Sequence, residues 1–152
     1  MRTHRSSRFL GIVTAALLAL GLVAGCGGGS SKPTFNEADA KAQVKANWEA
    51  FFDPAKSEDD HVALIEGGET LRAAVKAAAK NPLAAKTKTT VTNVVVDPGH
   101  TTATVTYNIA LNGTNVVDGG VGQAVYQDGK WKVSRDSFCG LANAGAPGTC
   151  PS

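Results

Sequence analysis

The sequence contains few of the residue types on which most enzymes and metal sites depend. It has three histidines and three cysteines among 152 residues, and none of them forms a cluster with the spacing of metal ligands. No serine lies in a nucleophile-elbow motif, and no glycine-rich loop has the pattern of a phosphate site. We therefore expect no catalytic residues, no metal and no cofactor.

The sequence also lacks a basic segment in its folded part. It has 15 basic and 13 acidic residues, but three of the basic ones (Arg2, Arg5 and Arg8) and none of the acidic ones lie in the first 25 positions. The remaining 127 residues therefore carry 12 basic and 13 acidic side chains, a net charge of −1. No basic patch remains that would suggest a nucleic acid partner.

The first 25 residues have the pattern of a secretory signal peptide. Three arginines precede an apolar run of 16 residues, Phe9 to Ala24, which is shorter than the roughly 20 residues of a membrane-spanning helix. The run ends in Leu22-Val23-Ala24-Gly25-Cys26, which resembles the bacterial lipobox. This resemblance implies cleavage after Gly25 and lipidation of Cys26. We therefore expect an exported lipoprotein, anchored to the outer face of the cell membrane and partly released.

A short flexible segment separates the expected anchor from a folded domain. Residues 26–33 contain three glycines and two serines, which leave the backbone unrestrained and form a tether. Residues 34–152 are then expected to form a single domain, a length that suffices for one hydrophobic core.

The other two cysteines, Cys139 and Cys150, are expected to form a disulfide. An exported protein reaches a compartment that permits disulfides. The alternative is a redox or metal site made by the two thiols. Their separation is far from C-x-x-C and no histidine lies near them, so we favour the disulfide.

The first half of the domain has the pattern of three helices. Asn36 is a good N-cap for a helix that Asp53-Pro54 should end. Ser57, followed by three acidic residues, opens a second helix that is expected to end at Gly67-Gly68. A third helix is expected over residues 69–80.

The second half has the pattern of antiparallel strands. Residues 101–111 alternate between apolar and polar side chains, which is typical of a strand with one buried face. Asn112-Gly113 and Asp128-Gly129 are hairpin turn signals, and Gly119-Gly120 is a place for a bulge. Four strands are expected, over residues 89–96, 101–111, 116–127 and 131–134.

These elements predict an α+β fold in which three N-terminal helices pack on a strongly bent antiparallel sheet of about four strands. Such a sheet, partly wrapped by helices, forms a cone-shaped hollow.

Several segments, in this order and spacing, resemble the C-terminal domain of the mycobacterial low-molecular-weight antigen family, which is similar in fold to the nuclear-transport-factor-2-like cone. The resemblance covers about 100 of the 127 residues that follow the expected cleavage site. It implies an exported, cell-envelope or secreted protein of actinobacteria with no established catalytic activity. The segments are Trp48-Glu49-Ala50-Phe51-Phe52-Asp53, Val62-Ala63-Leu64-Ile65-Glu66-Gly67-Gly68, Val105 to Leu111, Asp128 to Ser134, and Phe138-Cys139-Gly140-Leu141 with Cys150.

Enzymes on this cone fold place an Asp, His or Tyr inside the pocket to move protons. His61, in the first turn of the second helix, is expected to be solvated, and His100 to be a loop residue. Asp136, at the end of a strand, is the acidic residue that turn formation explains least. A proton-transfer enzyme is therefore the weakest of the three functions considered.

The aromatic residues either fill the cone or line a pocket inside it. Because only 6% of the chain is aromatic and a domain needs a packed interior, we favour filling. We accordingly expect a non-enzymatic envelope lipoprotein that acts as a binding or interaction module. The alternative is a carrier or sensor of a small apolar or lipid ligand held in the cone by Trp48, Phe51, Phe52, Tyr107, Tyr126 and Trp131.

Overall fold

The computed structural model describes residues 35–150 of the chain. The expected signal peptide, the lipidation of Cys26 and the tether lie outside the described residues. The α-helices are α1 (Glu37–Phe51), α2 (Glu58–Ala63), α3 (Arg72–Ala79) and α4 (Arg135–Gly145), with short 3-10 turns η1 (Gly68–Leu71) and η2 (Ala84–Lys86). The strands are β1 (Thr87–Val96), β2 (Thr102–Leu111), β3 (Thr114–Gln127) and β4 (Lys130–Val133).

Helix α1 begins where its sequence predicts. The Asn36 side chain accepts hydrogen bonds from the backbone N–H groups of Ala38 and Asp39, at 3.0 and 3.2 Å, so it satisfies donors that have no partner within the helix. The buried side chains recur on one face of the helix, which is the face turned to the sheet. They are Ala40, Val44, Trp48 and Phe51.

Helix α2 is shorter than its sequence suggests, and the prediction that it continues to Gly67-Gly68 is wrong. Its start is as expected, because Ser57 and Asp60 form a capping box. It ends at Ala63 because the next residues pair with β4. The Val133 N–H donates to the Leu64 carbonyl at 2.8 Å, and the Glu66 N–H donates to the Val133 carbonyl at 2.9 Å. These bonds to a distant strand replace further helical turns.

The predicted third helix is present, although its first turn is a 3-10 turn. The chain passes through η1 and then forms α3. Leu71, Ala74 and Val75 are buried on one side, as the apolar spacing indicates.

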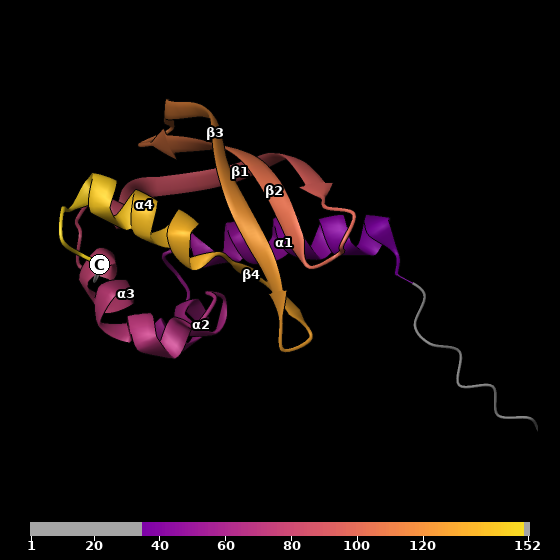
Figure 1. The fold of residues 1–152 in the computed structure, drawn as a ribbon. Coiled ribbons are helices and arrows are strands. Elements are labelled where there is room, and N and C mark those ends of the chain that lie inside the picture. Colours follow the sequence, from indigo (N-terminus) through magenta and orange to yellow (C-terminus); the bar gives the residue numbers. More distant parts are fainter. Residues whose placement is uncertain (1–34, 151–152) are drawn as a thin grey trace, which may run out of the picture. The chain divides into compact units, whose positions relative to one another are not determined.

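The four strands form one antiparallel sheet in the order β1-β2-β3-β4 (Figure 1). Both hairpin turns have the expected geometry, since φ is positive at Asn112 and Gly113 and at Asp128 and Gly129. The register of β2 on β3 shifts after the pair Tyr107 and Gly120. The expected bulge therefore lies at Gly119-Gly120, and it contributes to the strong curl of the sheet.

Helix α4 follows β4 and was not predicted from the sequence. The Ser134 side chain caps it by accepting from the Ser137 N–H. The fold thus has a fourth helix in addition to the three at the N-terminal side, and the α+β cone-like architecture stands. Among residues 35–150, no helix has the length and apolar character needed to cross a membrane.

The core lies between the concave face of the sheet and the helices. Helix α1 crosses this face and packs on both edge strands, β1 and β4, while α4 lies over β3 (Figure 1). The centre of the core is fully enclosed. At most 1% of each residue is exposed at Val44, Trp48, Leu71 and Val105.

Candidate functional site

The aromatic residues proposed to line the cone are mostly part of its core. Trp48 and Trp131 are buried, as are Tyr107 and Phe51, whereas Phe52 is half-buried. The ring centroids of Trp48 and Tyr107 are 5.6 Å apart, and those of Trp48 and Phe52 are 6.2 Å apart.

Tyr126 is different from the rest of this set, because its side chain is 47% exposed. It pairs with Trp131 at the end of the sheet, and its ring packs on the Trp131 ring at 5.3 Å. It is the last residue but one of β3, next to the β3–β4 turn.

Two glycines of β3 make room for the largest rings. A Cβ atom added to Gly122 would lie 2.5 Å from Cη2 of Trp48, and one added to Gly120 would lie 2.8 Å from Cε2 of Tyr107. Both distances are shorter than van der Waals contact. The rings of Trp48 and Tyr107 therefore occupy the concave side of the sheet at these positions, where a ligand inside the cone would have to lie.

The surface of residues 35–150 has grooves beside the sheet, two of which have volumes suited to ligands. The first, here called the edge groove, has a volume of about 630 Å³ and lies between the end of α1 and the start of β1. Its volume is within the range of roughly 300–1,000 Å³ that is usual for ligand sites. Its lining consists of Glu49, Ala50, Phe52, Asp53, Pro54 and residues 87–90.

An ion pair of α1 closes one side of the edge groove. Lys45 Nζ donates to Glu49 Oε1 at 3.0 Å and to the Val91 carbonyl at 2.7 Å. Glu49 Oε1 also accepts from the Val91 N–H at 2.9 Å. The pair thus satisfies both backbone groups of Val91 on the edge strand, in the way that side chains or loops cover sheet edges in other proteins.

The second groove, here called the mouth groove, has a volume of about 500 Å³ and lies between α4 and strands β2 and β3. The Tyr107 hydroxyl is a neutral hydrogen-bonding group, and burial raises its pKa. The Ser137 hydroxyl accepts from the Gln123 N–H at 2.8 Å. The lining consists of Thr104, Tyr107, Val121, Gly122, Gln123, Asp136, Ser137, Gly140 and Leu141.

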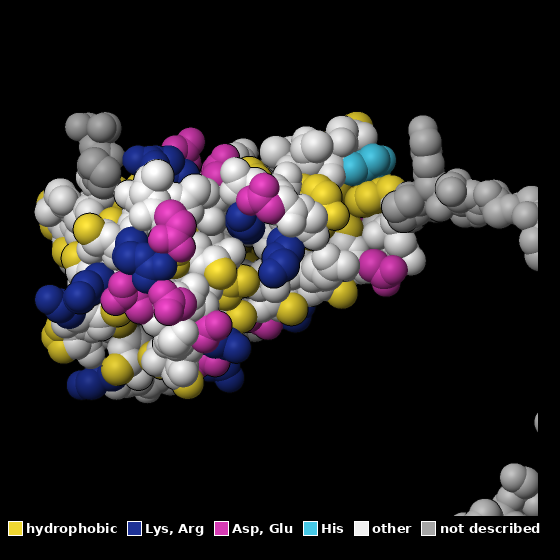
Figure 2. All heavy atoms as spheres, turned by 90° about the horizontal axis from the view of Figure 1, so that it is seen from below, with side chains coloured by type: hydrophobic (Ala, Val, Ile, Leu, Met, Phe, Trp, Pro, Cys, Tyr) yellow, Lys and Arg dark blue, Asp and Glu magenta, His cyan; other side chains and the backbone are white. Residues whose placement is uncertain are grey.

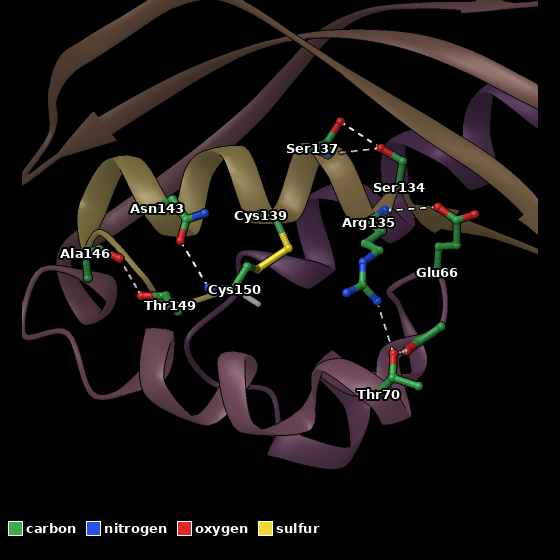
Figure 3. Close-up of a disulfide and its surroundings, with 11 residues drawn as sticks. Glu66, Thr70, Ser134, Arg135, Ser137, Cys139, Asn143, Ala146, Thr149 and Cys150 are labelled. Atoms are coloured by element: carbon green, nitrogen blue, oxygen red, sulfur yellow. Dashed lines mark hydrogen bonds between the residues drawn. A yellow bond between two sulfur atoms is a disulfide. The ribbon is translucent and has the colours of Figure 1, made fainter. Parts of the chain in front are cut away.

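The disulfide between Cys139 and Cys150 is present, with their Cα atoms 5.5 Å apart. It ties α4 to the chain that follows it, and the Asn143 side chain supports this turn by accepting from the Cys150 N–H at 3.0 Å (Figure 3). At the other end of α4, Glu66 Oε2 accepts from the Arg135 N–H at 3.0 Å. These contacts hold α4 in place over the mouth groove.

Within residues 35–150, neither His61 nor His100 has the surroundings of a catalyst. His61 Nε2 lies 3.0 Å from the Asp53 carbonyl, and its ring packs edge-on against Phe51. His100 is in the β1–β2 turn with φ of 56°. Its ring stacks on the Phe35 ring, with the two ring centroids 3.7 Å apart. His61 is half-buried, so the prediction that it is solvated holds only in part.

Asp136 is exposed and lines the mouth groove. Within residues 35–150, no group of three or more His, Cys, Asp or Glu side chains is placed to hold a metal ion.

Charges of both signs are mixed on the face that carries α2 and α3 (Figure 2). Arg72 is the centre of one such cluster and pairs with Glu58, Asp59 and Glu69 at 2.6–3.3 Å. Because Arg72 offsets only one of these three negative charges, the cluster keeps an excess of negative charge.

Sequence reasoning missed both grooves. The spacing of Phe138, Leu141 and Ala142 after the good cap Ser134 is a helical signal that would have revealed α4 and with it one wall of the mouth groove. The i,i+4 pair of Lys45 and Glu49 is visible in the sequence, but its contact with Val91 is not.

The comparisons with known proteins agree with the architecture. The family model described as low molecular weight antigen MTB12, C-terminal domain, matches residues 37–149. No curated protein matches the chain. The match spans the helices and the curled sheet, and the chain belongs to the family of the low molecular weight antigen MTB12, through its C-terminal domain.

Proposed function

We propose that this protein is an exported cell-envelope lipoprotein whose cone domain acts as a non-enzymatic binding module. The antigen family indicates an exported protein. The sequence adds the anchor, because a lipobox ends at Cys26 and a run of glycine and serine follows it. Such a tether lets the domain meet partners away from the membrane surface.

The observation that carries this proposal is the close packing of Trp48 and Tyr107 against Gly122 and Gly120. Because these rings occupy the concave side of the sheet, binding falls to the surface grooves and not to the inside of the cone. An open groove suits a partner that is itself solvated, such as a segment of another protein.

A carrier of a small apolar ligand is the second candidate. The mouth groove favours it, since the neutral Tyr107 hydroxyl offers one polar contact in a groove of suitable volume. Native mass spectrometry separates the two functions. The binding module predicts the mass of the acylated polypeptide alone after purification from its own host. A stoichiometric non-covalent ligand would instead support the carrier.

The anchor has its own experiment. Cells fed an alkyne-bearing palmitate are expected to label the wild-type protein and to retain it in the membrane fraction. Cys26→Ala should lose both properties, whereas the double variant Cys139→Ala/Cys150→Ala should keep both, because only Cys26 follows a lipobox. A labelled, membrane-bound Cys26→Ala protein would show that the lipoprotein assignment is wrong.

A further inference from the structure

Strand β1 is an edge of the sheet, since it pairs with β2 on one side only. In an antiparallel pair, residues alternate between those whose backbone groups bond to the partner strand and those whose groups point away from it. The Val91 N–H and C=O point away from β2, because they bond to Glu49 and Lys45 of α1.

The same alternation directs the backbone groups of Thr89 away from β2. The register is regular from Thr87 to Val91. The Lys86 carbonyl accepts from the Asn112 N–H beyond the end of β2. Lys86 is three residues before Thr89, so the alternation directs its backbone groups to the opposite side from those of Thr89. Apart from the ladder between β1 and β2, the Thr89 N–H and C=O have no backbone hydrogen-bond partner among residues 35–150. The Thr89 N–H and C=O are therefore directed away from β2, toward the edge groove that Thr89 lines.

A second observation comes from the side chain of Thr89. This residue is only 6% exposed, and its hydroxyl is buried without a hydrogen-bond partner in the described part of the chain. A buried polar group without a partner is costly and uncommon. Thr89 lines the edge groove. A segment bound in this groove would therefore supply a hydrogen-bond partner for the Thr89 hydroxyl.

The groove has different chemistry on its two faces. Ala50, Phe52 and Pro54 give the lining an apolar part that suits an apolar side chain. The lining also contains two carboxylates, and both are engaged within the chain: Glu49 accepts from the Val91 N–H and Asp53 from the Ala55 N–H. Lys88 is exposed on the outer face and forms no ion pair within residues 35–150.

We propose that the edge groove binds an extended peptide segment of a partner protein, which adds as a short antiparallel strand beside Thr87 to Thr89. The peptide residue opposite Thr89 exchanges two backbone hydrogen bonds with it and places an apolar side chain against Phe52. The neighbouring peptide residue carries a carboxylate and lies beside Lys88. This inference rests on the proposed binding function and names the class of partner.

The length of the peptide site is limited by the Lys45–Glu49 pair. Because that pair occupies the backbone groups of Val91, an incoming strand cannot continue along β1 past Thr89. The free edge is shorter than the five to six residues of a usual strand, at about three residues. A short segment fits this space, whereas a long strand that would propagate a sheet does not.

The test uses the capped peptide acetyl-Thr-Glu-Val-Glu-Thr-amide as the probe and the ¹⁵N-labelled mature chain with its disulfide intact. Saturable shift changes are expected at residues 87–90 and at Phe52, with roughly millimolar affinity because few hydrogen bonds form. The Thr89 N–H should also exchange more slowly with solvent when the peptide is bound.

Two controls identify the mode of binding. A peptide N-methylated at its central valine keeps every side chain but cannot donate to the Thr89 carbonyl, so its affinity should fall roughly tenfold or more. Lys88→Glu should weaken binding roughly threefold through lost attraction. Lys130→Glu, which changes another exposed lysine in the β3–β4 turn, should leave the affinity unchanged.

Equal binding of the N-methylated peptide, absence of saturation, or shifts confined to the mouth groove would each overturn strand addition at β1. Native mass spectrometry and labelling at Cys26 test the proposed function, whereas the peptide titration tests the site at β1. A negative result in one set of experiments therefore leaves the other conclusion standing.

Discussion

Replacement of Gly122 by alanine tests whether the cone is filled. The new Cβ would lie 2.5 and 2.8 Å from Cη2 and Cζ2 of Trp48, and 3.2 Å from the Ser137 hydroxyl oxygen. Trp48 is 1% exposed and its ring is enclosed by those of Tyr107 and Phe52, so it has little space into which to move.

The expected cost combines two opposing effects. Overpacking of a core costs about 1–3 kcal/mol, while replacement of glycine by alanine recovers about 0.4–1 kcal/mol through the unfolded chain. The net loss of unfolding free energy is therefore about 1–2 kcal/mol, which lowers Tm by roughly 5–10 °C for a domain of this size. Urea unfolding of the oxidised protein, followed by tryptophan fluorescence, measures it.

Gly140→Ala is the matched control. Gly140 lies in α4, and a Cβ added there meets no atom within 4 Å. This variant should be more stable than the wild type by about 0.5–1 kcal/mol, because alanine favours a helix over glycine.

Trp48→Phe in the Gly122→Ala background provides a second check. Phenylalanine lacks the distal ring atoms that the new Cβ contacts, so the double-mutant cycle should show a coupling of about 1 kcal/mol or more. A Gly122→Ala protein as stable as the wild type would refute the filled cone, because it would mean that space exists beside Trp48.

Three further predictions concern the fold. The variant Cys139→Ala/Cys150→Ala should lose about 3 kcal/mol of unfolding free energy in urea, because the disulfide closes a loop with a sequence separation of 11. A hydrogen bond from Ser57 lowers the pKa of Asp60, so this contribution to stability is present above the unfolded-state pKa and disappears as pH falls through the folded-state pKa. Ser57→Ala should accordingly lose less stability on acidification than the wild type, as measured by thermal unfolding from pH 6 to pH 3, and an equal loss would contradict the capping box. Burial raises the pKa of Tyr107, so the wild type should lose stability as pH rises above about 10, and Tyr107→Phe should lose less over the same interval.

Much of the local structure follows from residues close to one another in the chain. Asn36 and Ser57 cap their helices through bonds to groups two or three positions away. Asn112-Gly113 and Asp128-Gly129 adopt positive φ because their own chemistry permits it. The pairing of Cys139 with Cys150 was also predictable, since only these two cysteines follow Cys26.

Other features depend on residues far apart in the sequence, and local patterns do not contain them. Helix α2 ends at Ala63 because Leu64 and Glu66 bond to Val133. Tyr126 alternates with the buried Ala124 and lies opposite the buried Trp131, yet it is 47% exposed, which its spacing does not indicate.

By itself, the sequence determined the caps, the hairpin turns, the alternation of the strands, the disulfide and the family, because each depends on local chemistry or on residue order. Only the tertiary structure decided that Trp48 and Tyr107 fill the cone and that the backbone groups of Thr89 face the edge groove. The reason is physical: whether a ring finds a glycine opposite it, or a backbone amide finds a partner, is settled by which distant segments the fold brings together.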